Sequence, residues 1–375
     1  MTSNSSPPPS AGPGAPQRRH VLEDDPGALR RWLQSLDQPA YRAGQILKWV
    51  YERGAERLDE MSNLPKALRA RLAEEAAICT STVAATAVSE DGTHKLLLAW
   101  PDGQTTETVW IPAERRQTAC VSTQVGCPVG CRFCASGLDG LGRNLTAGEI
   151  VEQALRVANL IRHHPDLDDA SRRLSNIVIM GTGEPLANYE ATIAAIRTLN
   201  ASWGLGIGAR KITISTVGLP KQIRRLAAED LQLNLALSLH APTDRLRAEL
   251  VPWARGVSIA ELVRACREYF EQTGREITLE YVLLDEVNMQ PEHAEGLARI
   301  ARRLRANVNL LRYNPVPGLP YRRPNSQRTH AFQRRLRELG VNVHLRSSRG
   351  RDVSAACGQL RRAQGADGPP PERGN

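Results

Sequence analysis

From residue 119 to about residue 345, the sequence alternates between short strand-like runs and longer helix-like segments. The strand-like runs are ACVSTQ, SNIVIMG, RKITIST, LNLALSLH, EITLEYVLL, VNLLRY and VNVHL. Helical spacing of apolar residues marks the segments 147–162, 189–199, 259–272 and 291–304 between them. Such repetition predicts an α/β fold with a parallel sheet and crossover helices. The number of units favours a partial or complete (β/α) barrel with active-site groups at the carboxyl ends of its strands, and a doubly wound open sheet is the alternative.

Segments of other kinds surround this repetition. One has helically spaced apolar residues and predicts a helical accessory domain. Another has Asp-Gly turns between strand-like runs, which is the signal of a small β-hairpin linker. Both ends of the chain are rich in proline, glycine and polar residues, so we expect them to be disordered. The predicted division is a tail at 1–19, the helical domain at 20–80, the linker at 81–117, the barrel core at 118–347, a C-terminal segment at 348–360 and a second tail at 361–375.

The charge balance of the chain is basic. Lysine and arginine number 49 against 40 acidic residues, for a formal net charge of +9. Such an excess favours a polyanionic partner such as a nucleic acid, although a solvated basic surface would give the same count. No apolar run approaches the roughly 18–20 residues of a membrane span, and the first twenty residues lack the apolar middle of a secretory signal. The sequence therefore predicts a cytoplasmic protein without a membrane partner.

Three of the seven cysteines are tightly clustered. Cys127, Cys131 and Cys134 form a C-x3-C-x2-C motif in QVGCPVGCRFCASG, on a loop that follows the first barrel strand. An odd count and this clustering argue against a disulfide framework and favour metal or redox chemistry. No fourth cysteine or histidine lies nearby to complete a tetrahedral zinc site. A [4Fe–4S] cluster needs only these three ligands and leaves one iron open, so the motif predicts such a cluster.

This spacing resembles the signature of radical S-adenosylmethionine (radical SAM) enzymes. In that superfamily the open iron binds S-adenosylmethionine, whose one-electron cleavage yields a 5′-deoxyadenosyl radical. The stretch MGTGEP at the end of the second strand supports this interpretation, because it is similar to the glycine-rich loop of the superfamily. Gly183 permits close approach of the backbone, and Glu184 can accept a hydrogen bond from the methionine amino group of the cofactor.

Over roughly residues 40 to 360, the chain resembles the RlmN family of radical SAM methyltransferases, which act on adenine C2 in RNA. The matching stretches are RAGQILKWVYERG, MSNLPKALRARL, ETVWIP, CVSTQVGCPVGCRFCASG, GTGEPLAN, RKITISTVG, LALSLHAP, YVLLDEVN, NPVPGLPYRRP and DVSAACGQL. The resemblance implies two substrates, an adenosine in the peptidyl-transferase loop of 23S rRNA and the adenosine 3′ of the tRNA anticodon. It also implies flavodoxin as the electron donor.

The resemblance assigns roles to individual residues. Cys127, Cys131 and Cys134 would bind the cluster, and Glu107 would be the catalytic acid or base. Cys357, in AACGQL, would be methylated by a first S-adenosylmethionine, and Cys120 would later close a transient disulfide with it. The positions implied to contact S-adenosylmethionine are Gly183, Glu184, Ser215, Ser238, Leu239, His240 and Asn314.

Two molecules of S-adenosylmethionine would be needed per turnover, because adenine C2 is electrophilic and does not accept a methyl cation. In the scheme that the resemblance implies, the Cys357 thiolate takes the first methyl group. The radical then abstracts hydrogen from that methyl group, and the carbon radical adds to C2. Attack by Cys120 on the Cys357 sulfur breaks the carbon–sulfur bond and leaves a disulfide that must be reduced. The target base must be unstacked or flipped to expose C2.

Two alternatives remain open. A Cfr-like enzyme would use the same cofactors and cysteines to methylate adenine C8, although the fit to the RlmN motifs favours C2. A non-catalytic iron–sulfur module that only binds RNA is the second alternative. It predicts neither a need for Cys357 nor turnover of S-adenosylmethionine.

Overall fold

The computed structural model describes residues 18–114 and 116–346, and its main feature is a ten-stranded mixed sheet. The strand order is β14-β13-β12-β11-β10-β9-β6-β5-β4-β3, and the strands from β6 to β14 are parallel. The parallel strands are β6 (Arg116–Cys120), β9 (Asn176–Ile179), β10 (Ile212–Thr216), β11 (Asn234–Ser238), β12 (Ile277–Leu283), β13 (Asn307–Arg312) and β14 (Val343–Arg346).

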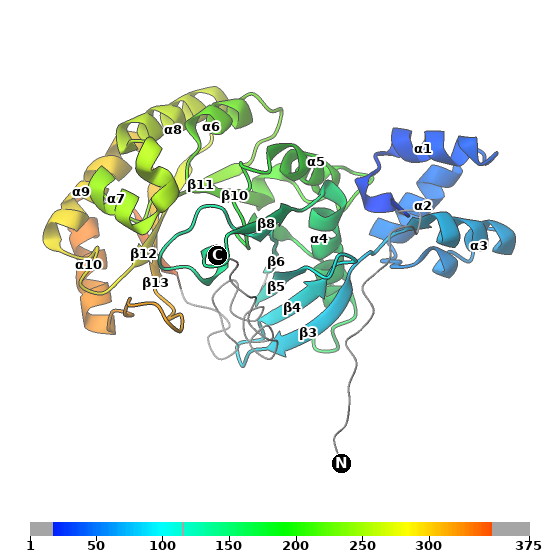
Figure 1. Cartoon of the computed structure of the whole chain (residues 1–375), viewed down its shortest axis with the longest axis horizontal. Coiled ribbons are helices and arrows are strands. Elements are labelled where there is room, and N and C mark those ends of the chain that lie inside the picture. The colour runs from blue at the N-terminus through cyan, green and yellow to red at the C-terminus, as the bar shows by residue number, and fades with distance from the viewer. Residues whose placement is uncertain (1–17, 115, 347–375) are drawn as a thin grey trace, which may run out of the picture.

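This order confirms the predicted partial barrel and excludes the doubly wound alternative. A doubly wound sheet reverses its strand order at a switch point, whereas each parallel strand here pairs with the next one along the chain. Within the described ranges, β14 and β3 are the two edges and do not pair with each other. The sheet therefore curves without closing (Figure 1).

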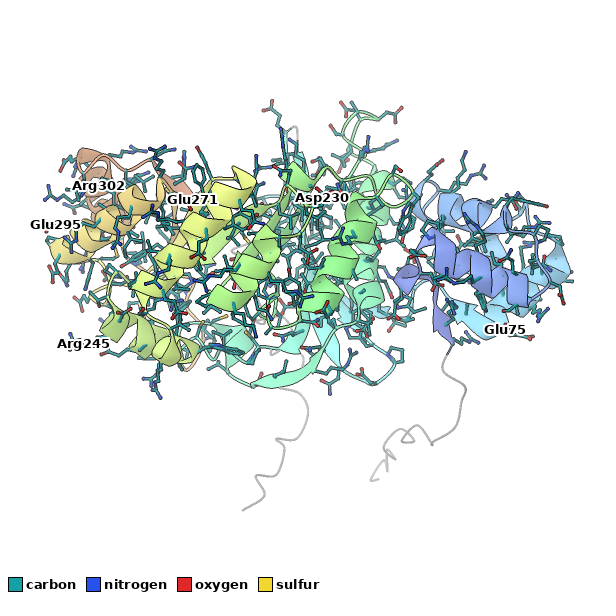
Figure 2. All side chains as sticks on the ribbon, turned by 90° about the horizontal axis from the view of Figure 1, so that it is seen from above. Glu75, Asp230, Arg245, Glu271, Glu295 and Arg302 are labelled. Carbon is teal, nitrogen blue, oxygen red and sulfur yellow. The ribbon has the colours of Figure 1, made fainter. Side chains whose placement is uncertain are left out.

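Helices connect the parallel strands and form an arc around the sheet (Figure 1). They are α4 (Ala147–Arg162), α5 (Tyr189–Asn200), α6 (Pro220–Ala227), α7 (Asp244–Leu250), α8 (Ile259–Thr273), α9 (Pro291–Leu304) and α10 (Ser326–Glu338). Local sequence sets their starts, as in α4, where Thr146 and Glu149 form a reciprocal capping box. Exposed charged residues such as Glu271 and Arg302 lie on their outer surface (Figure 2).

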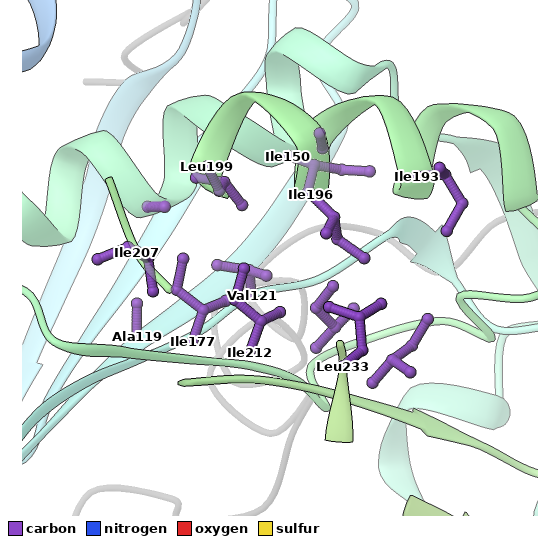
Figure 3. Packing of buried hydrophobic residues seen from close by; sticks show 14 of the residues in the cluster. Ala119, Val121, Ile150, Ile177, Ile193, Ile196, Leu199, Ile207, Ile212 and Leu233 are labelled. Carbon is purple, nitrogen blue, oxygen red and sulfur yellow. The ribbon is translucent and has the colours of Figure 1, made fainter. Parts of the chain in front are cut away.

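Apolar side chains on alternate positions of the parallel strands form the core with these helices. Ile177 of β9 and Ile212 of β10 are fully buried, and Figure 3 shows them beside Ile150 of α4 and Ile196 of α5. Successive side chains of a strand point to opposite faces, so the intervening residues lie on the concave face of the sheet. That face carries many polar residues and is the face on which the candidate site lies.

Three antiparallel strands extend the same sheet. They are β3 (Thr82–Val88), β4 (His94–Ala99) and β5 (Thr105–Ala113). The predicted turns are present, with Gly92 and Gly103 at φ values of 79° and 78°. Sequence analysis predicted a separate hairpin linker, but β5 pairs directly with β6, from Val109 opposite Cys120 to Ala113 opposite Arg116. This pairing uses the backbone groups of β6 that would otherwise form an open sheet edge.

A small helical unit precedes these strands and lies at one end of the molecule (Figure 1). It contains α1 (Pro26–Ser35), α2 (Arg42–Tyr51) and α3 (Lys66–Glu75), which bury Leu29, Leu33, Ile46, Val50 and Leu72. No helix of the described residues has the length and apolar character of a membrane span. The remaining elements are β1 (Arg19–His20), β2 (Ala76–Ala77), β7 (Gln124–Gly126), β8 (Leu141–Asn144), η1 (Val21–Glu23), η2 (Leu58–Glu60), η3 (Ala135–Gly137), η4 (Ala209–Lys211) and η5 (Pro252–Gly256).

Glu152 of α4 fixes the helical unit to the barrel. Its buried carboxylate accepts hydrogen bonds from the backbone nitrogens of Thr80 and Ser81, at 2.8 and 2.9 Å. His20 Nε2 and Arg156 Nη2 lie 3.4 and 3.5 Å from the same carboxylate. Burial alone would raise the pKa of Glu152, but hydrogen bonds from His20, Ser81 and Thr80 outweigh it and lower the pKa to about 2. An ionised, fully partnered carboxylate therefore holds the two parts together.

We expect Glu152→Gln to lower the free energy of unfolding at pH 7 by about 1.5–3 kcal/mol, because hydrogen bonds to a charged group are lost. The folded-state pKa is depressed, so this stabilisation is complete above the unfolded pKa of about 4.3 and is lost as pH falls toward the folded value. Urea unfolding at pH 7 and pH 3 should show the wild-type advantage shrinking at pH 3. Glu52→Gln, at the exposed position that follows α2, should change the free energy by no more than about 0.5 kcal/mol. An equal loss at both pH values for Glu152→Gln would contradict this account.

Candidate active site

The three cysteines of the C-x3-C-x2-C motif lie on one loop between β7 and η3. Cys127 N donates to Gly140 O at 2.8 Å, and Cys134 N donates to Cys131 O at 3.1 Å, so the backbone of the loop is internally bonded. All three side chains are free thiols and half-buried. Burial raises the pKa of Cys127 to about 12, and burial together with the neighbouring thiols raises the pKa of Cys131 well above its usual value. Thiolates on this loop therefore require a cationic partner such as a metal centre.

Three thiols on one loop match the number of protein ligands that a [4Fe–4S] cluster with one open iron needs. In the described part of the chain, no three His, Cys, Asp or Glu side chains are grouped to hold a single metal ion. The three cysteine ligands of a [4Fe–4S] cluster bind three different irons, so their sulfur atoms lie farther apart than the ligands of a single metal ion. The loop itself is tied to the barrel, since Arg132 N donates to Leu250 O of α7 at 3.0 Å.

Arg247 of α7 places a buried positive charge near this loop. Its side chain is 1% exposed, and its Nη2 donates to Val217 O. Its Nε and Nη1 are buried and have no hydrogen-bond partner in the described residues. Burial lowers the pKa of Arg247 to about 10, and the negative charge of Cys131 opposes that shift. Because an unpartnered buried cation is costly, this guanidinium fits a site where anionic thiolates of a bound cluster are its neighbours.

His240 follows β11 and packs against the cysteine loop. Its ring meets Phe133, the aromatic residue between the last two cysteines, at a centroid distance of 5.0 Å and an angle of 76°. Burial, assisted by the charge of Arg247, lowers the pKa of His240 to about 3. The neutral imidazole accepts a hydrogen bond from Val282 N through Nδ1 at 3.2 Å. The histidine is therefore held in place by both packing and hydrogen bonding.

Glu184 closes the loop after β9. Its buried carboxylate accepts hydrogen bonds from Leu186 N, Thr216 Oγ1 and Val217 N at 2.8–2.9 Å. Burial raises the pKa of Glu184 to about 7, although the hydrogen bonds from these three donors lower it. The preceding Gly183 has a φ of +115°, and a Cβ there would lie 2.8 Å from side-chain atoms of neighbouring residues. The glycine is therefore required by conformation and by space, and Glu184 ties this loop to the end of β10.

The other implied cofactor contacts lie at or after the carboxyl ends of successive strands. Ser215 of β10 and Ser238 of β11 face each other with their hydroxyl oxygens 3.2 Å apart. Leu239 is fully buried in the core. Asn314 follows β13, and its Oδ1 accepts a hydrogen bond from Arg323 Nη1 at 2.9 Å. The parallel register therefore places these residues at one end of the sheet, as the sequence predicted.

Cys120 and Glu107 lie on the concave face of neighbouring strands. Cys120, at the end of β6, pairs in register with Val109 of β5, two residues from Glu107. Glu107 forms a buried ion pair with Lys95 of β4, with 3.1 Å between Nζ and Oε2. Burial raises the pKa of Cys120 to about 11, opposed by a backbone hydrogen bond at Met180 and by the charges of Lys95 and Arg346. The structure thus brings Cys120 and Glu107 together, while Cys357 lies outside the described residues.

Four functional candidates were missed by sequence analysis, namely Lys95, Arg247, Glu280 and Asn309. Three of them share a signal that was available. Lys95, Glu280 and Asn309 are polar residues inside otherwise apolar strand runs, HKLLLA, EITLEYVL and VNLLR. A polar residue that interrupts an apolar strand marks the face that lines a site. Arg247 gives no such signal, because a charged residue on a short helix is usually exposed.

Comparison with known proteins identifies the family. Residues 21–78 match the model of the ribosomal RNA large subunit methyltransferase N-terminal domain, and residues 121–301 match that of the radical SAM superfamily. A probable dual-specificity RNA methyltransferase RlmN of Rhodopirellula baltica is 46% identical over 93% of this chain and 92% of its own length. The corresponding protein of Thermosynechococcus vestitus is 47% identical over 90% of this chain and 96% of its own length. This chain belongs to the RlmN family.

A solved structure agrees with that assignment. The crystal structure of a radical SAM methyltransferase from Sphaerobacter thermophilus has a TM-score of 0.87 and 47% identity, and the match covers 91% of this chain and 98% of that one. Membership of the radical SAM superfamily confirms the predicted cofactors, a [4Fe–4S] cluster and S-adenosylmethionine. It also makes this RlmN-family protein an RNA methyltransferase.

We expect Arg247→Met to have different effects on the apoprotein and on the cluster-loaded protein. Removing a buried cation with two nitrogens that have no hydrogen-bond partner in the described residues should leave the melting temperature of the apoprotein unchanged or higher, whereas the loaded protein loses a favourable charge. Iron loss to a chelator should become roughly tenfold faster, which corresponds to about 1.4 kcal/mol. Iron release and thermal unfolding of both forms are the measurements.

Arg245→Met is the matched control, because Arg245 is an exposed arginine on the same helix, and it should affect neither quantity. A drop in apoprotein stability with unchanged iron release would show that Arg247 only supports the local fold.

Proposed function

We propose that this RlmN-family protein methylates C2 of adenosine in both 23S rRNA and tRNA, at the peptidyl-transferase loop and at the adenosine 3′ of the anticodon. One observation carries the proposal. The N-terminal domain, the cysteine loop and the strand-end residues occur in one chain that covers about nine-tenths of relatives named dual-specificity RNA methyltransferases. The concave face adds a cysteine and a carboxylate, Cys120 and Glu107, on neighbouring strands.

The proposed roles of the chain at the cofactor end follow from the contacts described above. Cys127, Cys131 and Cys134 hold the cluster, and Glu184 holds the loop around Gly183 so that its backbone faces the cofactor. Ser215, Ser238, Leu239, His240 and Asn314 complete the S-adenosylmethionine site. When bound, the cluster and S-adenosylmethionine would supply a 5′-deoxyadenosyl radical, and the first S-adenosylmethionine of each turnover would supply the methyl group.

Cys357 and Cys120 are the proposed methyl carrier and resolving thiol. The buried Cys120 thiol has a raised pKa, so its attack on a sulfur atom requires proton removal. Lys95 lowers that pKa and is ion-paired with Glu107, which places a cation and a base beside the thiol. We assign to Glu107 the removal of the proton from adenine C2, which must leave when the methyl group takes its place. The disulfide left between the two cysteines is reduced before the next turnover.

We assign RNA binding to the helical unit at residues 20–80, whose family model is that of a ribosomal RNA methyltransferase domain. Its basic residues include Arg42, Lys48, Lys66, Arg69 and Arg71. Lys48 and Arg71 form ion pairs with acids one turn along the chain, at 3.6 and 3.0 Å. These pairs hold the two side chains in place and would compete with RNA phosphates for them. RNA substrates of these two kinds also place the enzyme in the cytoplasm, and flavodoxin is the proposed electron donor.

The decisive experiment compares wild type with Cys357→Ala after anaerobic reconstitution with iron and sulfide. Each protein receives S-adenosylmethionine, a reductant and either an unmethylated 23S rRNA fragment or tRNA. We expect C2-methyladenosine from wild type on both RNAs and none from Cys357→Ala, measured by mass spectrometry of the digested RNA. Cys266→Ala serves as the control, because Cys266 is a core residue of α8 and is not one of the proposed site residues, and it should retain activity.

The other outcomes distinguish the rivals. C8-methyladenosine would assign the protein to the Cfr-like activity. Binding of RNA without any methylation, in protein that holds an intact cluster, would favour the non-catalytic module. Methylation of only one RNA would restrict the proposed substrate range.

A further inference from the structure

A cavity of about 450 Å³ opens on the concave face of the sheet and is lined by residues of the strands β9 to β14. This volume lies within the roughly 300–1,000 Å³ of small-molecule sites. Its lining includes Met180, Glu280, Asn309 and Arg346. Arg346 lines the cavity together with Glu280, and its charge lowers the pKa of both Glu280 and Cys120, so the cavity lies near the strand end that carries Cys120.

The register of the sheet aligns the polar residues of this cavity with the cofactor end. Glu280 of β12 lies opposite Ser238 of β11 on one side and Asn309 of β13 on the other. Because partners in a parallel register share a face, the three side chains form a row across the sheet. Ser238 is the proposed S-adenosylmethionine contact, and Glu280 and Asn309 continue the row from it into the cavity.

Glu280 has the chemistry of a recognition group rather than of a surface carboxylate. The residue is 6% exposed, and its Oε1 accepts a hydrogen bond from Asn309 Nδ2 at 2.9 Å. Burial raises the pKa of Glu280, opposed by that hydrogen bond and by the charge of Arg346. The charged groups facing it across the cavity are Arg346, Arg275 and Glu276. The protonated form of such a carboxyl offers one donor and one acceptor side by side.

Adenine presents the complementary pair. Its N1 accepts a hydrogen bond, and its neighbouring exocyclic 6-amino group donates one, on the edge that becomes free when the base is flipped. A hydrogen bond at N1 also falls on the ring atom next to C2, which is the carbon that reacts.

We propose that Glu280, oriented by Asn309, hydrogen-bonds N1 and the 6-amino group of the flipped adenine, and that this cavity is the base-recognition pocket. The inference rests on the proposed function, because it takes the base to be adenine. It makes Glu280 a specificity-determining residue that acts on the substrate and not on the cofactor. Asn309 acts through Glu280 and is a positioning residue.

The test measures kcat/KM for an RNA stem-loop carrying adenine at the target position and for the same RNA carrying purine, which lacks the 6-amino group. Wild type should prefer adenine by roughly tenfold, the effect of one hydrogen bond in a buried site. Glu280→Gln keeps a donor and an acceptor, so it should retain the preference and most of the rate. Glu280→Ala should lose the preference, and adenine methylation should fall at least as far as purine methylation in wild type.

Glu271→Ala is the control. Glu271 is an exposed carboxylate on the outer surface of α8 (Figure 2), and it is not among the residues that line the cavity. It should leave both rates unchanged. Iron content and formation of 5′-deoxyadenosine should match wild type in every variant, which shows that the cofactor end is intact.

Three results would overturn the proposal: equal rates on the two RNAs for wild type, an unchanged preference in Glu280→Ala, or loss of preference in Glu280→Gln. The wild-type comparison needs no variant to fold. A wild-type protein that methylates neither RNA would instead refute the proposed function itself, so the two failures are distinguishable.

Discussion

The alternation of side chains along the parallel strands is the constraint on which the rest of this structure depends. Each strand sends one set of side chains, such as Ile177 and Ile212, into the core under the helices. The other set lies on the concave face, where no helix of the described residues covers it. Because the period is two, a shift of one residue in any strand would exchange the core and the site. The same pattern that stabilises the barrel therefore places polar chemistry on its inner face.

Hydrogen bonds and ion pairs between buried polar groups hold the residues of that face in place. Glu184 joins two strand ends through hydrogen bonds from Thr216 Oγ1 and Val217 N, and Lys95 pairs with Glu107 where both are nearly inaccessible to water. Charges in such positions persist only with partners, because the dehydration of an isolated charge is costly. Arg247 differs in that two of its nitrogens have no hydrogen-bond partner in the described residues. This pattern is expected of a protein that completes its electrostatics only when its cofactors bind.

Much of the fold and part of the site could be predicted from the sequence. The order of strands and helices, the hairpin turns and the cysteine loop all leave local signals, because periodicity, Asp-Gly pairs and ligand spacing act over a few residues. The continuity of β5 with β6 could not be predicted this way, since strand pairing over long distances depends on which backbone edges meet. Arg247 was missed for a similar reason, because its burial depends on how α7 returns to the cysteine loop. Glu280 could have been recognised from the sequence, because it is a carboxylate inside an apolar strand.

The sequence by itself determined the class of chemistry, since three cysteines at this spacing and a family pattern along the chain specify ligand types without coordinates. It also determined the α/β repetition, because the helical or strand spacing of apolar residues depends only on the local order of residues. Only the tertiary structure decided which residues share a surface. Cys120, Glu107, Ser238, Glu280 and Asn309 come from five different strands, and the sheet register alone brings them to one face. That register is a property of long-range backbone pairing, which no single stretch of the sequence contains.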